Sequence, residues 1–256
     1  MQVLMLAAGR GSRLGPARPK CLTVLAGRTL LSWQIEALRA AGATRITLVT
    51  GYEAAQLQAQ AGIDACIHHA DWAHTGPVGS LAAGLDAVDG QGDCLIAYAD
   101  CLWHPDWPRR LHKARLPLAL PCDRAFAQLW QARFSDPLLD AETLRMEDCG
   151  DHWRLREIGQ RAVQLADIEA QFMGLLWVRR DAQAWLRERL AALTDEERRR
   201  LDLTALLSRW LQAGVEIEAM PGSGGWIELD RPEDLALYAR RAQDADWTHD
   251  WRRAPT

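Results

Sequence analysis

Glycines and basic residues gather just behind the first residues of the chain, in a segment that could bind phosphate. The segment Leu6–Leu22 reads LAAGRGSRLGPARPKCL. Gly9 and Gly11 lack side chains, so backbone N–H groups at this turn can face an anion. Arg13 and Lys20 add two positive charges beside it. Backbone donors combined with two cations suit a triphosphate, so the segment predicts a loop that binds an NTP.

This segment differs from two familiar phosphate-binding loops. It is not a Walker A loop, because it contains no G-K-[ST]. Leu14 stands where the dinucleotide-binding motif has its third glycine. The alternative interpretation is a plain turn from strand to helix with its cations in solvent. The combination of glycines, cations and a preceding apolar strand favours phosphate binding.

Two carboxylates end expected strands that lie far apart in the sequence. Asp100 closes the apolar run Ile96–Asp100, and Asp230 closes Trp226–Asp230. Glu228 shares a strand face with Asp230. Mg²⁺ prefers one or two carboxylates, with water and phosphate oxygens completing its shell. We therefore expect Asp100 and Asp230 to bind Mg²⁺, with Glu228 as a further ligand. The alternative for each aspartate is a turn or helix cap.

The elements that must position these groups alternate between strand and helix over the first half of the chain. The expected strands are Val3–Ala7, Ile46–Thr50, Cys66–His69 and Leu95–Tyr98. The expected helices are Leu30–Ala41, Ala54–Ala61 and Leu81–Val88. This order predicts an α/β fold with a mainly parallel sheet, helices on both faces and ligands at the carboxyl ends of its strands.

The pattern changes from about residue 117. Strand-like runs without long intervening helices predict a mixed or antiparallel extension over the site, formed by Leu116–Pro121, Gln128–Phe134, Trp153–Ile158 and Phe172–Val178. Later helices are expected at Asp181–Leu193, Leu201–Ala213 and from Pro232 onward, with a strand at Val215–Met220. The tail after about Ala245 is polar, and we expect it to be frayed.

Composition narrows the class of protein. Hydrophobic residues make up 48% and charged residues 25%, which is ordinary for a globular protein. The net charge of −4 argues against broad binding to nucleic acid or anionic membrane. Six cysteines without a C-x-x-C pair suit the reducing cytoplasm. No apolar run is long enough for a membrane span. We therefore expect a cytoplasmic protein without nucleic-acid or membrane partners, and its oligomeric state stays open.

The segment Leu6–Leu22 resembles the signature of the NTP-transferase superfamily, whose core is Rossmann-like. The strand-end Asp100 and the W-x-E-x-D of Trp226–Asp230 match its metal-binding positions. The resemblance implies that Arg13 and Lys20 are catalytic, with Lys20 near the transferred phosphorus. It implies nucleotide contacts from Leu6, Ala7, Ala8, Gly9, Gly11 and Ser12. Arg13 and Lys20 are closer together than in many sugar nucleotidyltransferases of this superfamily.

A second Gly/Pro turn, Thr75–Leu81, leads into an expected helix. Ser80 could be its N-cap, which alone would explain the turn. In cytidylyltransferases of the superfamily the corresponding loop packs on the pyrimidine. The resemblance therefore implies that Gly79 and Ser80 contact the base.

The middle of the chain looks like the phosphocholine-type branch of the superfamily. It is similar to capsule-cluster cytidylyltransferases, including those that make CDP-glutamine from phosphoglutamine. The segments that carry this resemblance are Asp136–Leu144, Arg156–Gly159 and Ile168–Leu175. With the N-terminal loop and the strand at 226–230, it covers nearly the whole chain.

Charged and aromatic residues in this middle part suggest an acceptor pocket. Carboxylates would suit an ammonium group, arginines a carboxylate or phosphate, and aromatic rings a quaternary ammonium. The candidate carboxylates are Glu142, Glu169 and Asp140, and the candidate arginines are Arg133 and Arg161. The candidate rings are Tyr98, Trp103 and Trp130. The alternatives are an exposed charged face and core tryptophans.

We interpret residues 1–256 as one nucleotidyltransferase domain. Residues 1–115 form its NTP-binding half, 116–180 its acceptor-binding strands, 181–245 its C-terminal helices with the metal-binding strand, and 246–256 its tail. The expected reaction is transfer of CMP from CTP to a small phosphorylated acceptor such as phosphoglutamine or phosphocholine. Pyrophosphate would leave, and the CDP-linked product would serve capsule or surface polysaccharide modification. The alternatives are a sugar-1-phosphate nucleotidyltransferase that uses UTP or dTTP, and a nucleotide sensor without activity.

Overall fold

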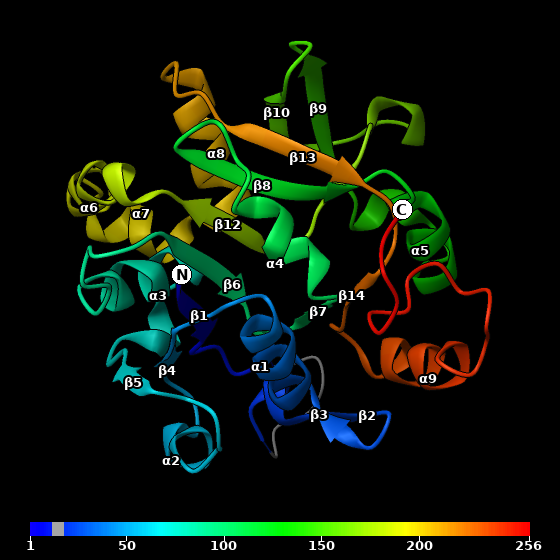
Figure 1. The fold of residues 1–256 in the computed structure, drawn as a ribbon, viewed down its shortest axis with the longest axis horizontal. Coiled ribbons are helices and arrows are strands. Elements are labelled where there is room, and N and C mark those ends of the chain that lie inside the picture. The colour runs from blue at the N-terminus through cyan, green and yellow to red at the C-terminus, as the bar shows by residue number, and fades with distance from the viewer. Residues whose placement is uncertain (12–17) are drawn as a thin grey trace.

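The computed structural model describes residues 1–11 and 18–256 of the chain. Its central sheet follows the order β5-β4-β1-β6-β12-β8-β13-β10-β9, and β11 pairs with β8 (Figure 1). The strands of this sheet are β1 Gln2–Ala7, β4 Arg45–Thr50, β5 Ala65–His68, β6 Cys94–Tyr98, β8 Leu118–Asp123, β9 Glu142–Asp148, β10 Trp153–Arg161, β11 Gln171–Phe172, β12 Leu175–Val178 and β13 Glu218–Gly222. Two small ribbons pair β2 Val24–Leu25 with β3 Arg28–Thr29, and β7 Cys101–Trp103 with β14 Trp226–Glu228.

The strands β5, β4, β1 and β6 are parallel, as the alternation of strands and helices predicts. Beyond β6 the sheet is mixed, because β12 is antiparallel to both β6 and β8 while β13 is parallel to β8. The predicted α/β fold, with a parallel part and a mixed extension, is confirmed.

Helices cover both faces of the sheet because its apolar strands are buried on both sides. Along β1, Val3 and Met5 enter one core cluster and Leu4 enters the other. The first cluster includes helices α1 Leu30–Ala40, α4 Asp106–Leu111, α5 Phe126–Arg133 and α9 Pro232–Arg241. The second includes α3 Pro77–Leu85, α6 Gln183–Ala191 and α8 Leu203–Gln212, and α2 Ala54–Gln58 and α7 Asp195–Arg200 lie at the periphery (Figure 1).

The predicted strand Gln128–Phe134 is wrong, since this segment belongs to the helix α5. The buried residues of α5 recur at intervals of three and four, which is the helical period. They are Phe126, Leu129, Trp130 and Arg133.

The suggested N-cap at Ser80 is also wrong. Helix α3 begins earlier, with Gly76 as its N-cap and Pro77 in its first turn. Proline is favoured there because its fixed φ suits the helix and its missing N–H is not needed. Ser80 already lies inside the helix and donates its backbone N–H to Gly76 O.

The polar tail is docked rather than frayed. His249, Asp250 and Trp251 are buried. His249 Nε2 lies 2.9 Å from Asp123 Oδ2 at the end of β8. Figure 1 shows the red C-terminal segment running from α9 back towards the end of β13, where Thr256 exchanges backbone hydrogen bonds with Ser223.

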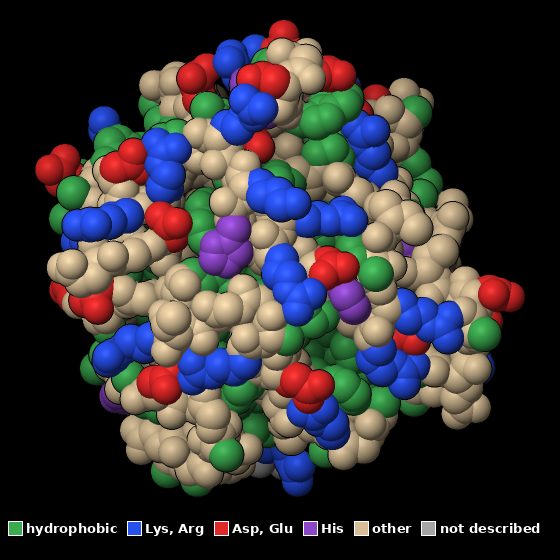
Figure 2. Space-filling view, viewed as in Figure 1, with side chains coloured by type: hydrophobic (Ala, Val, Ile, Leu, Met, Phe, Trp, Pro, Cys, Tyr) green, Lys and Arg blue, Asp and Glu red, His purple; other side chains and the backbone are tan. Residues whose placement is uncertain are grey.

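The molecular surface carries mixed charge. Basic side chains are spread over the face shown in Figure 2, and acidic side chains lie among them. Every helix within residues 1–11 and 18–256 is too short or too polar to cross a lipid bilayer.

Candidate functional site

The glycine turn follows directly after β1. Gly11 has φ +61°, a region that suits glycine, and a Cβ built on it would lie 2.7 Å from Lys20 Cβ. Glycine at this position therefore lets the turn pack directly on Lys20. Ser12 and Arg13, which we expected to bind the triphosphate, lie outside the described residues.

The ribbon of β7 and β14 joins the two acidic segments, which are far apart in the sequence. Glu228 pairs with Cys101, and Leu229 donates its N–H to Asp100 O at 3.0 Å. The buried Gln34 of α1 donates to the backbone carbonyls of Tyr98 and Cys101, and so fixes the chain on either side of Asp100. The predicted juxtaposition of Asp100 with Glu228 and Asp230 is present.

Lys20 lies between these carboxylates. Its Nζ is 2.8 Å from Asp100 Oδ2 and also contacts Asp230 Oδ1. Burial alone would lower the pKa of Lys20, but Asp100, Asp230 and Glu228 outweigh that effect and raise it. The lysine is therefore a firmly charged cation at the centre of the site.

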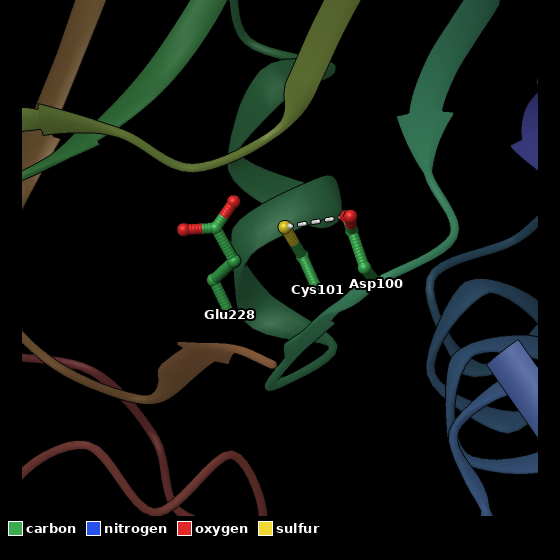
Figure 3. Close-up of side chains that lie close together, drawn as sticks. All are labelled: Asp100, Cys101 and Glu228. Carbon is green, nitrogen blue, oxygen red and sulfur yellow. Dashed lines mark hydrogen bonds between the residues drawn. The ribbon is translucent and has the colours of Figure 1, made fainter. Parts of the chain in front are cut away.

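The donor set around Lys20 fits a hard divalent cation. Ligand atoms of Asp100, Cys101 and Glu228 lie within 4.8 Å of one another (Figure 3). Burial, together with Asp100 and Glu228, raises the pKa of the Cys101 thiol, which donates to Asp100 Oδ1 at 3.6 Å. Mg²⁺ prefers oxygen ligands, so the carboxylates are the groups of this set that could hold it.

Arg133 does not line an acceptor pocket, contrary to our expectation. Its side chain is fully buried and reaches three carboxylates, Glu228, Asp230 and Asp234, each at 3.2 Å. Burial raises the pKa of Glu228, and its neighbour Asp230 raises it further, while Arg133 opposes the shift. Arg133 is therefore a buried, structural counter-ion of the carboxylates at the acidic site. Asp234, which sequence reasoning missed, completes this network.

The expected nucleotide-binding residues line two adjoining hollows. One of about 230 Å³ lies at the glycine turn and includes Lys20, Asp100 and Asp230. The other, of about 180 Å³, is formed by the turn before α3 together with the end of β1. Leu6, Ala7, Gly9 and Gly11 line the first, and Leu6, Ala8, Gly9, Trp72, Gly76, Pro77 and Ser80 line the second.

Trp72 is a wall residue that sequence reasoning missed. Its ring packs edge-on against Tyr52, at 5.6 Å between centroids. A Cβ on Gly51 would lie 2.5 Å from Trp72, so this glycine makes room for the indole. The glycine that ends β4 was the available signal.

Gly79 lies elsewhere than expected. It lines a separate hollow of about 470 Å³ between α3, α6 and α7, which contains neither the glycine turn nor the acidic site. A Cβ on Gly79 would lie 2.5 Å from the Thr75 side chain, so its glycine is explained by packing.

A further hollow of about 330 Å³ opens on the other side of Asp100 and Asp230, and we call it the acceptor hollow. Tyr98 and Glu142 line it as expected. Glu169 does not, because it is exposed and accepts a hydrogen bond from Met146 N. Trp103 is a core residue that donates to Met173 O. The other lining residues are Pro77, Cys101, Trp130, Asp140, Gln171, Phe172, Gly174, Asp202, Thr204 and Glu228.

The arrangement can bring two phosphorylated molecules together. The glycine turn and Lys20 can bind a polyphosphate on one side, and the acceptor hollow opens on the other. The carboxylates stand between the two, where a cation could bridge phosphate oxygens. The two hollows share Asp100 and Asp230, so this arrangement suits direct transfer between the two molecules.

Comparison with known proteins agrees with this geometry. The family model described as the MobA-like NTP transferase domain matches residues 3–203. The chain is 29% identical to the CTP:phosphoglutamine cytidylyltransferase of Campylobacter jejuni, over 94% of this chain and 100% of that protein.

Solved structures share the fold. The inositol-1-phosphate CTP transferase from T. maritima has a TM-score of 0.71 at 18% identity, covering 95% of this chain and 96% of the other. A UDP-glucose pyrophosphorylase has a TM-score of 0.72 at 14% identity, covering 94% and 97%. Because these proteins differ in base and acceptor, the shared fold decides neither.

Proposed function

Because the chain belongs to the MobA-like NTP transferase family, it is a nucleotidyltransferase, and we propose that it transfers CMP from CTP to a small phosphorylated acceptor. The observation that carries this proposal is the position of Lys20. It lies between Asp100 and Asp230, where the hollow at the glycine turn meets the acceptor hollow. The choice of CTP is supported by the 29% identity to a cytidylyltransferase over nearly the whole chain.

The proposed reaction needs no covalent intermediate. An oxygen of the acceptor phosphate attacks the α-phosphorus of CTP and forms a new P–O bond. The bond from that phosphorus to the bridging oxygen of the β-phosphate breaks, and pyrophosphate leaves with its electron pair. The acceptor phosphate is largely ionised near pH 7, so no strong general base is required. The protein contributes position and positive charge, from the glycine turn and Lys20.

We further propose that Mg²⁺ is the cofactor, held by Asp100 and Asp230 with Glu228 beside them. When bound, it would supply positive charge to phosphate oxygens of both substrates. The buried Arg133 pairs with Glu228 and Asp230 and fixes their orientation from the opposite side. With a divalent cation between the carboxylates, Lys20 would be available to the phosphates.

Pyrophosphate release across a panel of NTPs and acceptors tests the proposal. We expect turnover with CTP and a small phosphorylated acceptor when Mg²⁺ is present. Asp100→Asn and Asp230→Asn should lower kcat by at least about 100-fold, as expected for lost stabilisation of charge in the transition state. Asp86→Asn, at the exposed C-cap of α3, is the matched control. Release from UTP or dTTP with a hexose phosphate would instead establish the sugar-1-phosphate alternative.

A nucleotide sensor without activity would bind CTP and release no pyrophosphate with any acceptor. Its site would have no need of a lysine placed between two carboxylates, so Lys20 argues against this alternative. A cytoplasmic location and a role of the CDP-linked product in capsule or surface polysaccharide modification complete the proposal.

A further inference from the structure

The acceptor hollow contains negative charge that the described protein leaves unbalanced. Asp140, Glu142 and Asp202 line it, and none of them forms an ion pair with a Lys, Arg or His in the part of the chain that the structure describes. Asp100 and Asp230, which line the same hollow, are paired with Lys20. Asp140, Glu142 and Asp202 are therefore a second group of carboxylates, separate from the pair that contacts Lys20.

Neutral groups hold two of these carboxylates in place. Trp130 Nε1 donates to Asp140 Oδ2 at 3.1 Å. Asp202 is the N-cap of α8, where its Oδ1 accepts from Ala205 N at 2.8 Å and from Thr204 Oγ1 at 3.1 Å. These hydrogen bonds fix the oxygens and leave the negative charge uncompensated.

Glu142 responds to this crowding. Its side chain is partly buried at the start of β9, and burial raises the pKa of its carboxyl. Asp202 and Asp140 raise it further, against a hydrogen bond from Thr204. A cation in the hollow would relieve all three carboxylates at once.

Aromatic rings form the rest of the wall. Tyr98, Trp130 and Phe172 line the hollow, and Tyr98 packs edge-on against Phe172 with 6.3 Å between centroids. Aromatic faces attract ammonium groups through the negative charge above the ring. Rings and carboxylates in one small hollow thus favour the same kind of ligand.

The hollow also disfavours one kind of acceptor. None of its described lining residues is a Lys, Arg or His. A carboxylate on the acceptor would therefore face Asp140, Glu142 and Asp202, with no cation among the described lining residues to receive it. Like charges that share one small hollow repel each other, and this repulsion costs free energy.

We propose that the acceptor is a phosphate monoester whose other end carries a positively charged amine and no carboxylate. This proposal rests on the proposed function, since the acceptor phosphate must lie at Asp100 and Asp230. It separates this chain from its C. jejuni relative, whose name assigns it phosphoglutamine, a compound that has both an ammonium and a carboxylate group. Asp140, Glu142 and Asp202 are its specificity-determining residues.

Three matched acceptors test the charge preference with Mg²⁺ and CTP. Phosphoethanolamine carries the amine, ethyl phosphate has nearly the same size without the amine, and phosphoserine adds a carboxylate to phosphoethanolamine. We expect kcat/KM for phosphoethanolamine to exceed that of either other compound by about tenfold or more, the equivalent of one charged contact. Equal use of ethyl phosphate, or better use of phosphoserine or phosphoglutamine, would overturn the proposal.

Charge-neutral variants assign the preference to the named carboxylates. Glu142→Gln and Asp202→Asn should each reduce the preference for phosphoethanolamine over ethyl phosphate by about tenfold. Asparagine still caps a helix, so Asp202→Asn removes the charge and keeps the start of α8. Glu147→Gln, on the same strand as Glu142 but exposed, is the matched control and should keep the full preference. Unchanged preference in both variants, with normal melting temperatures, would refute the assignment.

Binding separates this proposal from the proposed function. If CTP is not turned over with any acceptor, the cytidylyltransferase proposal fails. Calorimetric titration of the same three compounds into the protein with Mg²⁺ then still decides the charge preference. Tighter binding of phosphoethanolamine than of ethyl phosphate and phosphoserine would support it, and equal or weaker binding would reject it.

Discussion

At the scale of single residues, Lys20 meets two demands that compete. Its ammonium group pairs with Asp100 and Asp230, and these same carboxylates are the proposed metal ligands. Lys20→Met should lower kcat by at least about 100-fold, because a cation beside the phosphates is lost. The same variant should bind Mn²⁺ more tightly than the native protein when no nucleotide is added, since it removes the ammonium group that contacts Asp100 and Asp230. Electron paramagnetic resonance of free Mn²⁺ measures this binding.

Lys113 supplies the control for that experiment, because it is exposed and lies on the segment after α4. Lys113→Met should change neither turnover nor Mn²⁺ binding. If Lys20→Met bound Mn²⁺ more weakly than native protein, the lysine would be supporting the metal site rather than competing with it.

Arg133 illustrates what residue type alone cannot decide. A basic residue in the middle segment suggested an acceptor ligand, but the side chain points into the protein beneath Glu228 and Asp230. Its direction depends on the helical phase of α5, and we had expected a strand there. Because this segment was predicted as a strand and not a helix, the buried Arg133 was predicted to bind the acceptor.

Removing this cation should destabilise the fold. Arg133→Met removes the buried cation that Glu228, Asp230 and Asp234 share, and breaking such a buried pair costs about 3–5 kcal/mol. Chemical denaturation measures the loss. Arg156→Met, which removes an exposed ion pair with Glu147, should cost no more than about 1 kcal/mol. Equal losses in the two variants would mean that the network beneath the acidic site is not a unit of stability.

At the scale of elements, the sequence predicts the strands and their ends better than it predicts which segments pack against the sheet. The apolar runs at β1, β4 and β6 are unmistakable, and the expected residue stands at the end of each. The docking of the tail was not predictable from its polar composition. Its contacts depend on isolated residues such as His249 and Trp251, whose partners lie far away in the sequence.

The docked tail has a consequence for the strand β14. Gly224 and Gly225 precede this strand, and Gly225 donates its N–H to Thr248 O in the tail. Gly224 has φ +69°, and a Cβ on it would lie 2.1 Å from that same carbonyl oxygen. Gly224→Ala should therefore displace the tail or the turn, and with it Glu228.

We expect Gly224→Ala to lower the melting temperature by several degrees, because strain and steric overlap act together. It should also raise the Mg²⁺ concentration needed for half-maximal activity by at least about threefold, a shift worth ~0.7 kcal/mol. Gly92→Ala is the control, since no atom lies within 4 Å of its Cβ and its φ is not positive. A melting temperature and Mg²⁺ requirement unchanged in Gly224→Ala would show that the tail does not hold the strand.

At the scale of the whole molecule, the site forms only because the fold brings a C-terminal segment next to the N-terminal part of the chain. Lys20, Asp100 and Asp230 are distant in sequence, and the sheet with its small ribbon brings them into contact. Local patterns identified Lys20 as a candidate phosphate ligand and Asp100 and Asp230 as candidate metal ligands. Their meeting was implied by the superfamily resemblance, since no spacing rule connects positions so far apart. The composition of the acceptor hollow could be predicted only in part. Tyr98, Glu142, Asp140 and Trp130 were expected there, but Asp202 and Thr204 were not, because the start of their helix was considered only as a boundary.

This long-range assembly predicts how ligands should stabilise the protein. CTP with Mg²⁺ would connect the N-terminal half of the sheet to β14 and the C-terminal helices, and binding to the folded state alone adds about 2.7 kcal/mol at a hundredfold excess over Kd. We expect a clear rise in melting temperature with both together, and a much smaller one with CTP plus EDTA. Asp230→Asn should lose the Mg²⁺-dependent part, because it removes the carboxylate that the C-terminal part contributes. An equal rise with and without Mg²⁺ would mean that the nucleotide binds only to the glycine turn, and the two parts of the cleft would then act independently.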